Sequence, residues 1–142
     1  MGQHRPNMQQ IINKIKTCFK RGGTVFIAGN GGSSAHASHL SEELISLCYP
    51  AIALNDPQVL TALTNDFSSE EAFAIYLEAV AKEGDLFIAI STSYKSENIL
   101  EAIDRAKEID IEYIKFPRRG KTTEDIQDYQ QRVIHKIYKA FK

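Results

Sequence analysis

The residues with the clearest potential for chemistry follow an apolar run at 24–28. Segment 29–34 reads Gly-Asn-Gly-Gly-Ser-Ser and leads into a stretch with helical patterning. Glycines permit positive φ and a close approach of a ligand to the backbone, and free N–H groups at a helix start favour an anion or polar oxygens. A tight strand-to-helix turn with a serine cap explains the same residues equally well. The segment lacks the lysine of a P-loop and the spacing of a dinucleotide-binding turn.

His39 and Glu43 lie just downstream, four residues apart. On a helix this spacing places both side chains on one face, about one helical turn beyond segment 29–34, which we call the glycine turn. A neutral imidazole and a carboxylate in this arrangement can hold a divalent metal or act as acid and base. A solvated helix face carries such pairs more often, so the pair by itself does not indicate a site.

A second polar turn carries four hydroxyl side chains between an apolar run at 86–90 and a helical stretch from 97. These side chains are Ser91, Thr92, Ser93 and Ser96. Hydroxyls and helix-start N–H groups together form a neutral cradle for a phosphate monoester. Helix capping needs one or two hydroxyls, so the excess favours phosphate binding over capping. Because the chain lacks a nucleotide fingerprint, we expect a small phosphorylated metabolite as the ligand.

The C-terminal stretch 122–141 has the periodicity of a helix with three different faces. The apolar face, which predicts core packing, consists of Ile126, Tyr129, Val133, Ile134, Ile137, Ala140 and Phe141. A solvated charged face consists of Asp128, Arg132, Lys136 and Lys139. Between them lies a stripe that is polar but almost uncharged, made of Glu124, Gln127, Gln131, His135 and Tyr138. Such a stripe suits the wall of an active site or a subunit contact, and a lightly charged surface explains it equally well.

Length and charge narrow the classes of function that remain. The 142 residues are enough for one domain with a buried core, and the net charge of −1 offers no electrostatic footprint for nucleic acid or an anionic membrane. No apolar run approaches a transmembrane span, and residues 1–5 lead into no signal-peptide core. Cys18 and Cys48 lack metal-binding spacing, and we expect both to be reduced and buried. We therefore expect a cytoplasmic protein without a nucleic-acid or membrane partner.

Hydrophobic patterning predicts the elements that position these residues. Strands are expected at 24–28, 51–54, 86–90 and 111–116, and helices at 8–19, after the glycine turn, from 59, and at 72–81, 97–109 and 122–141. Continuous apolar strands that alternate with helices indicate a parallel sheet covered on both faces. We therefore predict an α/β fold, a three-layer α/β/α sandwich with helices at both termini. It would form one domain over 1–142, with an N-terminal helix in 1–22, a core at 23–116 and the C-terminal helix at 122–141.

Together, these segments resemble the sugar isomerase (SIS) domain and, within it, the phosphoheptose isomerases. The resemblance rests on the glycine turn 29–33, the helix start 39–44, the Asn-Asp segment 60–67, the serine turn with its flanks at 84–93 and 96–98, and the pair Gln127 and His135. It covers the chain from about residue 22 onward in the family's order. The parallel sheet implied by the resemblance is flavodoxin-like.

The resemblance also implies a role for each matched residue. The phosphate would be held by Ser91, Thr92, Ser93 and Ser96. The sugar would contact Asn30, Gly31, Gly32, Ser33, Glu43, Asn65, Asp66 and Gln127. One zinc ion per site would be bound by His39, Glu43, Gln127 and His135, with Glu43 and His135 also serving as the acid–base pair.

The implied reaction is the aldose–ketose isomerisation of sedoheptulose 7-phosphate to a heptose 7-phosphate. It moves a proton between C1 and C2 through an enediol, so it needs a base, an acid and a group that polarises oxygen. The resemblance further implies a homotetramer with sites at subunit contacts, and heptose supply for lipopolysaccharide or capsule. Because eight helical residues rise about 12 Å, Gln127 and His135 must both lean inward to share one ion.

The chain departs from the family's pattern at two junctions. The family usually has a longer link, often with a substrate-contacting arginine, where this chain has 47–50, and a further strand, Gly-Gly loop and helix where it has 109–111. The second junction is awkward for a parallel crossover, so we expect either a pared-down member or loops missing from the sequence. The position of both junctions beside the site favours missing loops. Tyr94 stands where a glycine is usual, and His36, which suits a surface role better than that of a spare ligand, stands where an acid is common.

A non-catalytic phosphosugar-binding regulator of the same fold is the competing interpretation. One relative regulates bacterial replication by binding the initiator protein, and others are sensing domains of transcription factors. Such proteins keep the serine turn without needing a metal or a proton-transfer set. All four implied ligand positions carry competent residues here, which favours the enzyme.

Overall fold

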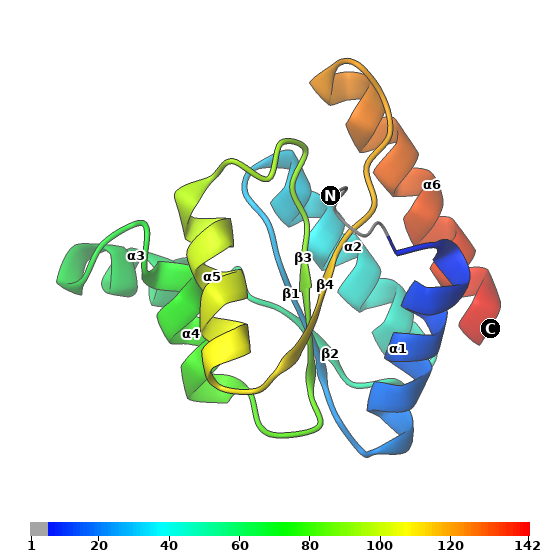
Figure 1. Cartoon of the computed structure of the whole chain (residues 1–142), viewed down its shortest axis with the longest axis horizontal. Coiled ribbons are helices and arrows are strands. Elements are labelled where there is room, and N and C mark those ends of the chain that lie inside the picture. The colour runs from blue at the N-terminus through cyan, green and yellow to red at the C-terminus, as the bar shows by residue number, and fades with distance from the viewer. Residues whose placement is uncertain (1–5) are drawn as a thin grey trace.

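The computed structural model describes residues 6–142 as a parallel sheet enclosed by helices (Figure 1). In this part of the chain the strands are β1 (Val25–Ala28), β2 (Ala51–Ala53), β3 (Leu86–Ala89) and β4 (Glu112–Lys115). The helices are α1 (Met8–Lys20), α2 (Gly32–Ser46), α3 (Pro57–Asp66), α4 (Ala72–Val80), α5 (Glu97–Glu108) and α6 (Thr123–Phe141). The predicted α/β sandwich is confirmed. Residues 1–5 of the expected N-terminal segment lie outside the described residues.

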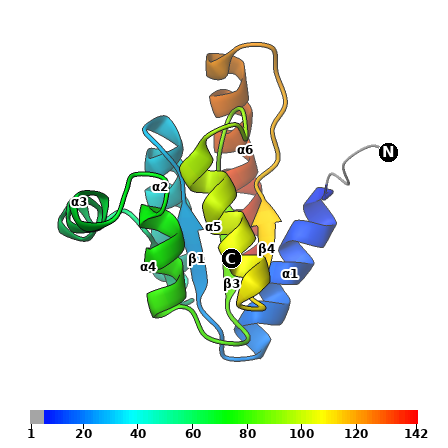
Figure 2. The same cartoon turned by 60° about the vertical axis from the view of Figure 1, so that its left-hand side comes forward.

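The central strands β1 and β3 supply side chains to two separate cores. Val25 and Ile27 pack with α1, α2 and α6 on one face, whereas Phe26 and Phe87 pack with α4 and α5 on the other. Figure 2 shows α1 and α4 on opposite sides of the strands. Every residue of both strands is buried. This two-sided burial explains why the strands are continuous apolar runs rather than alternating ones.

The order of the strands defines where a ligand can bind. The sheet runs β2-β1-β3-β4, and Ala28 at the end of β1 lies opposite Ala89 at the end of β3. From β1 the chain crosses through α2 on one face, and from β3 it crosses through α5 on the other. The winding therefore reverses between the carboxyl ends of β1 and β3, which is where open α/β sheets form their binding crevice. The glycine turn and the serine turn both begin at this point.

Both short junctions close as compact helix C-caps. Cys48 and Asp110 adopt left-handed φ values of 65° and 58°, and the next residue's N–H returns to a carbonyl of the helix, Tyr49 to Leu44 at 3.0 Å and Ile111 to Ala106 at 2.8 Å. These bonds satisfy carbonyls at the helix end. The expectation of an awkward crossover at 109–111 is wrong, because the connection from β3 to β4 includes the whole of α5. Neither link needs further residues to close.

Three details differ from the sequence-based expectation. Cys18 is buried as predicted, but Cys48 is exposed because it occupies the α2 cap. In α6, Phe141 packs against Phe19 and Tyr49 and turns Ala140 to solvent. Gln130 is fully buried in the middle of the core face of α6, although the core face predicted from the sequence did not include it.

Within residues 6–142, no helix combines the length and the apolar character needed to cross a membrane.

The two cysteines should differ in reactivity. Burial, reinforced by the Asp85 carboxylate, raises the pKa of Cys18 to about 11, so its thiol is protonated at neutral pH. We expect a thiol-specific disulfide reagent at neutral pH to modify Cys48 in the native protein and Cys18 only after unfolding. Cys48→Ser should abolish the native reaction, and Cys18→Ser should leave it intact. Rapid labelling of native Cys48→Ser would contradict this burial.

Candidate functional site

The glycine turn lies at the carboxyl end of β1, where the winding of the sheet reverses. Gly31 has a φ of 53° and precedes α2, and the carbonyl of Asn30 accepts the N–H of Ser33 at 2.8 Å. Gly32 allows a close approach, because a Cβ on it would lie only 2.3 Å from Nε2 of Gln127. The absence of a side chain at Gly32 therefore lets α6 place an amide directly against the turn.

The side-chain amides of Asn30 and Asn98 connect the glycine turn to the segment after the serine turn, at the point where the winding of the sheet reverses. Nδ2 of Asn30 donates to Oδ1 of Asn98, and Nδ2 of Asn98 donates back to Oδ1 of Asn30, both at 2.9 Å. Asn98 lies in the first turn of α5, so this pair ties the start of α5 to the glycine turn. Asn98 lies in the matched segment 96–98 but was not among the predicted site residues. Its position just after the serine turn was the available signal.

The serine turn is partly held by its own hydroxyls. Oγ of Ser91 accepts the N–H groups of Ser93 at 3.3 Å and Tyr94 at 2.9 Å, and Oγ of Ser93 accepts that of Lys95 at 3.1 Å. Ser96 occupies the N-cap of α5 without a capping bond from its side chain. Some of the hydroxyls thus shape the turn, while Ser96 remains available for a ligand at the helix start.

Partly buried Tyr94 and fully buried Gln130 fasten the serine turn to the end of β4. Tyr94, which has a left-handed φ of 53°, lies with its hydroxyl against the carbonyls of Ala89 and Phe116. Burial raises the pKa of Tyr94, so this hydroxyl stays protonated and donates. Nε2 of Gln130 donates to the carbonyls of Ser91 at 3.0 Å and Pro117 at 3.3 Å. The turn, the segment after β4 and α6 therefore form one connected unit.

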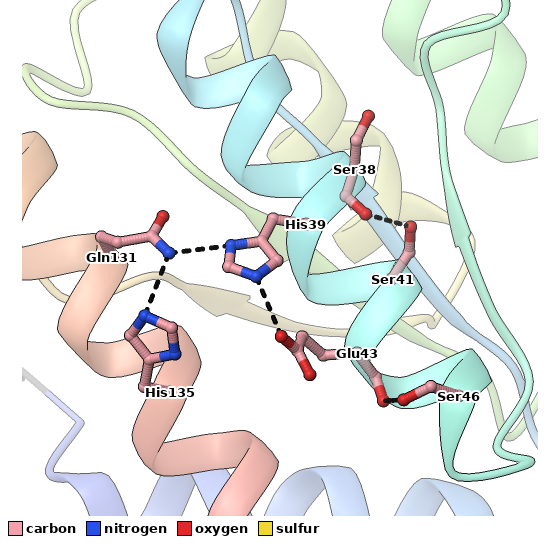
Figure 3. A network of polar contacts seen from close by, with 7 residues as sticks. All are labelled: Ser38, His39, Ser41, Glu43, Ser46, Gln131 and His135. Carbon is pink, nitrogen blue, oxygen red and sulfur yellow. Dashed lines mark hydrogen bonds and ion pairs between the residues drawn. The ribbon is translucent and has the colours of Figure 1, made fainter.

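The histidine and glutamate side chains gather where α2 meets α6 (Figure 3). Nε2 of His39 lies 2.9 Å from Oε1 of Glu43, and the ring centroids of His39 and His135 are 5.7 Å apart. Between the rings, Nε2 of Gln131 lies 2.9 Å from Nδ1 of His39 and 3.3 Å from Nε2 of His135. An amide NH₂ has two N–H groups and can therefore contact both rings at once. Gln131 belongs to the uncharged stripe, but its bridging position was not predicted.

The chain brings some of the predicted site residues together and keeps others apart. His39, Glu43 and His135 form the cluster described above, and Gln127 lies one turn from Gln131, against Gly32. Asn65 and Asp66 end α3, are exposed, and hydrogen-bond to each other at 3.2 Å. Figure 1 shows α3 at the side of the molecule opposite α6. One copy of the chain therefore does not unite the Asn-Asp segment with the histidine cluster.

His39 and Glu43 of this cluster, together with the neighbouring Glu42, have the donor set of a metal site. Donor atoms of His39, Glu42 and Glu43 lie within 4.8 Å of one another. The side chains of His39 and Glu43 are only 30% and 19% exposed, so a bound ion would be partly shielded from water. Imidazole nitrogen and carboxylate oxygen are ordinary ligands of zinc, and the residues present therefore fit a zinc ion.

His36 faces α6 rather than open solvent. Its Nε2 atom is buried and has no hydrogen-bond partner among the described residues. Burial lowers the pKa of His36, which keeps the ring neutral, and the backbone of Gln127 and the side chain of Gln131 face it from α6. The expected surface role is therefore wrong, because the α2–α6 contact half-buries this ring.

Comparison with known proteins identifies clear similarities. The profile of the SIS domain matches residues 2–116. The phosphoheptose isomerase of Haemophilus ducreyi is 38% identical, over 92% of this chain and 71% of that protein. The phosphoheptose isomerase of Sodalis glossinidius is 42% identical, over 74% of this chain and 57% of that protein, so the chain spans little more than half of this relative. The structure of the phosphoheptose isomerase of Neisseria gonorrhoeae superposes with a TM-score of 0.90 at 28% identity, covering 94% of this chain and 84% of that one.

Removing the amide of Gln130 should weaken the connection between α6 and the serine turn. Gln130→Leu leaves the carbonyls of Ser91 and Pro117 without their donor, which should cost about 1–3 kcal/mol of unfolding free energy. Urea denaturation of both proteins measures the difference. The matched control is Gln9→Leu, on the exposed side of α1, which should unfold like the wild type. Equal stability of Gln130→Leu and Gln9→Leu would contradict the proposed fastening.

Proposed function

The chain belongs to the SIS-domain family and is similar to its phosphoheptose isomerases, and from this premise we propose that it is an aldose–ketose isomerase of sedoheptulose 7-phosphate. The observation that carries the proposal is the meeting of His39, Glu43 and His135 between α2 and α6. A binding module needs the serine turn but not these three groups in contact. The product would be a heptose 7-phosphate formed through an enediol.

In this proposal the phosphate binds at the serine turn. The hydroxyls of Ser91, Thr92, Ser93 and Ser96 would surround it, and the start of α5 would contribute N–H groups. The glycine turn would contact the sugar through Asn30, Gly31, Gly32 and Ser33, together with Gln127. Because β1 and β3 are neighbours, the two turns bracket one crevice, and a phosphorylated sugar can reach from one to the other.

Zinc is the metal that we propose for the cluster, with His39, Glu43, Gln127 and His135 as ligands. Bound zinc would stabilise negative charge on a substrate oxygen. Support for this set comes from the contact of His39 with Glu43 and from the position of His135 on the facing helix. Gln127 would have to turn from Gly32 towards the histidines, as the distance along α6 requires.

Glu43 and His135 supply the proton transfers in this mechanism. One group removes the proton from carbon while the other donates a proton to the carbonyl oxygen, which gives the enediol. The groups then work in reverse: a proton returns to the neighbouring carbon while the hydroxyl proton leaves the other enediol oxygen, which becomes the new carbonyl. The 2.9 Å contact between Nε2 of His39 and Oε1 of Glu43 keeps the two side chains next to each other within the cluster. Gln131 orients both imidazole rings from α6.

We further propose that a complete site requires more than one copy of the chain, as in the expected homotetramer. The exposed Asn65 and Asp66 on α3 support this, because they stand far from α6 in one copy. Glu124 and His135 of the uncharged stripe are also exposed, whereas Gln127 and Gln131 contact α2 of the same chain. The stripe is thus partly an internal wall, and its exposed part is free to face a neighbour.

The non-catalytic regulator stays the alternative function. It predicts phosphosugar binding without isomerisation, and no feature of the α2–α6 cluster favours it. We also propose a cytoplasmic location and a role in heptose supply for lipopolysaccharide or capsule, because both accord with the proposed activity.

Substitution of the proton-transfer groups should separate catalysis from binding. Glu43→Gln and His135→Ala should each lower kcat by about 10²- to 10⁴-fold while the protein still binds the sugar phosphate. Glu108→Gln is the matched control, because Glu108 is exposed at the end of α5 and its ion pair is with Arg105, away from α2 and α6. Isomerisation is measured on a panel of sugar phosphates with and without a chelator, beside the zinc content. A wild type that binds sedoheptulose 7-phosphate without interconverting it would favour the regulator.

Mixing two inactive variants tests the shared site. Glu43→Gln and Asp66→Ala should each be inactive alone, and co-expression should restore part of the activity, because some sites then receive both intact residues. Co-expression of Glu43→Gln with His135→Ala is the control, since both residues come from one α2–α6 cluster. Light scattering gives the oligomeric state. A fully active monomer would refute the proposal.

A further inference from the structure

The ammonium of Lys115 lies over the ring of Tyr94, 5.6 Å from its centroid, and is engaged with that ring. Beyond it, the serine turn offers a phosphate little positive charge. Its hydroxyls are neutral, and the first turn of α5 contains the acidic residue Glu97, which would oppose an anion there. Lys95 belongs to the turn, but its side chain is exposed and forms no ion pair among the described residues. A phosphate dianion at this position therefore calls for a further cation.

Segment 117–121 supplies cations beside the turn. It reads Pro-Arg-Arg-Gly-Lys and has no acidic residue. Gln130 holds the carbonyls of Ser91 and Pro117 with one amide nitrogen, so the segment starts next to the turn. The contact of the Tyr94 hydroxyl with the carbonyl of Phe116 fixes the same junction from the other side.

The two arginines of this segment point to different surroundings. The guanidinium of Arg119 lies 5.7 Å from the ring centroid of Tyr129, and Arg119 shares a small cavity with Asp125 and Asp128. Arg118 is exposed and forms no ion pair among the described residues. Arg118 directly follows Pro117, whose carbonyl shares the Gln130 amide with the carbonyl of Ser91, so it is the arginine next to the serine turn. Burial raises the pKa of the Tyr94 hydroxyl, and the backbone of Ser91 and the charge of Arg118 partly offset that rise.

We propose that Arg118 binds the phosphate group of the substrate together with the hydroxyls of the serine turn. A planar guanidinium can donate two parallel N–H bonds to one phosphate, which hydroxyls alone cannot replace. The fastening of Pro117 by Gln130 keeps the reach of Arg118 short and constant. The inference rests on the proposed placement of phosphate at the serine turn, and it assigns a binding role to a residue outside that turn.

Arg118→Ala and Arg119→Ala form the matched pair that tests this role. Loss of a charge-assisted contact at a partly exposed site should raise KM for sedoheptulose 7-phosphate about tenfold in Arg118→Ala, with kcat little changed. Inorganic phosphate should become a correspondingly weaker competitive inhibitor. Arg119→Ala should keep the KM of the wild type, and Arg118→Lys should recover part of the loss because it restores charge without the planar fork.

Direct binding of inorganic phosphate and of the sugar phosphate, measured by calorimetry, separates this inference from the proposed activity. If the wild type binds but never isomerises, the activity fails, and a weaker affinity of Arg118→Ala still supports the arginine. Equal affinities of Arg118→Ala and Arg119→Ala overturn the inference, as does a loss seen in Lys95→Ala alone. Failure of the wild type to bind either ligand also overturns it. Thermal unfolding checks that Arg118→Ala is folded, with Arg118→Gln as a second variant.

Discussion

The parallel pairing of β1 with β3 is the constraint on which the rest of the molecule depends. Ala28 and Ala89 end these strands side by side, so the chain leaves the sheet twice at one place. The two departures go to opposite faces, which opens a crevice without any dedicated loop. Burial of both strands on both faces holds this geometry, since each residue of β1 and β3 is removed from water.

The α2–α6 contact adds chemistry to this frame. α2 starts at the glycine turn, so the helix fixes the positions of His39 and Glu43 relative to that turn. α6 packs against α2 and is hydrogen-bonded to the serine turn through Gln130. A bridging amide from Gln131 then links the two helices at the histidines. Contacts of α6 thus connect the residues proposed to bind phosphate with those proposed to move protons.

The sequence was sufficient for the elements and insufficient for several contacts between them. Apolar runs and helical stripes predicted the strands and helices because burial on both faces leaves a strong pattern. The same logic failed for Gln130, since a polar side chain on a core face is unexpected unless its distant carbonyl partners are known. Cys48 was expected to be buried, yet a left-handed helix cap exposes it. The pairing of Asn30 with Asn98 depends on strand order, which periodicity does not encode.

The left-handed Tyr94 has a consequence for how a ligand is received. Its backbone conformation is one that side-chain-bearing residues rarely adopt, and the hydrogen bond of its partly buried phenol to the carbonyl of Ala89 keeps the turn in that shape before anything binds. A receptor loop that is rigid in advance loses little conformational entropy on capture. A ligand should therefore bind to a preformed serine turn rather than induce the shape of that turn on binding.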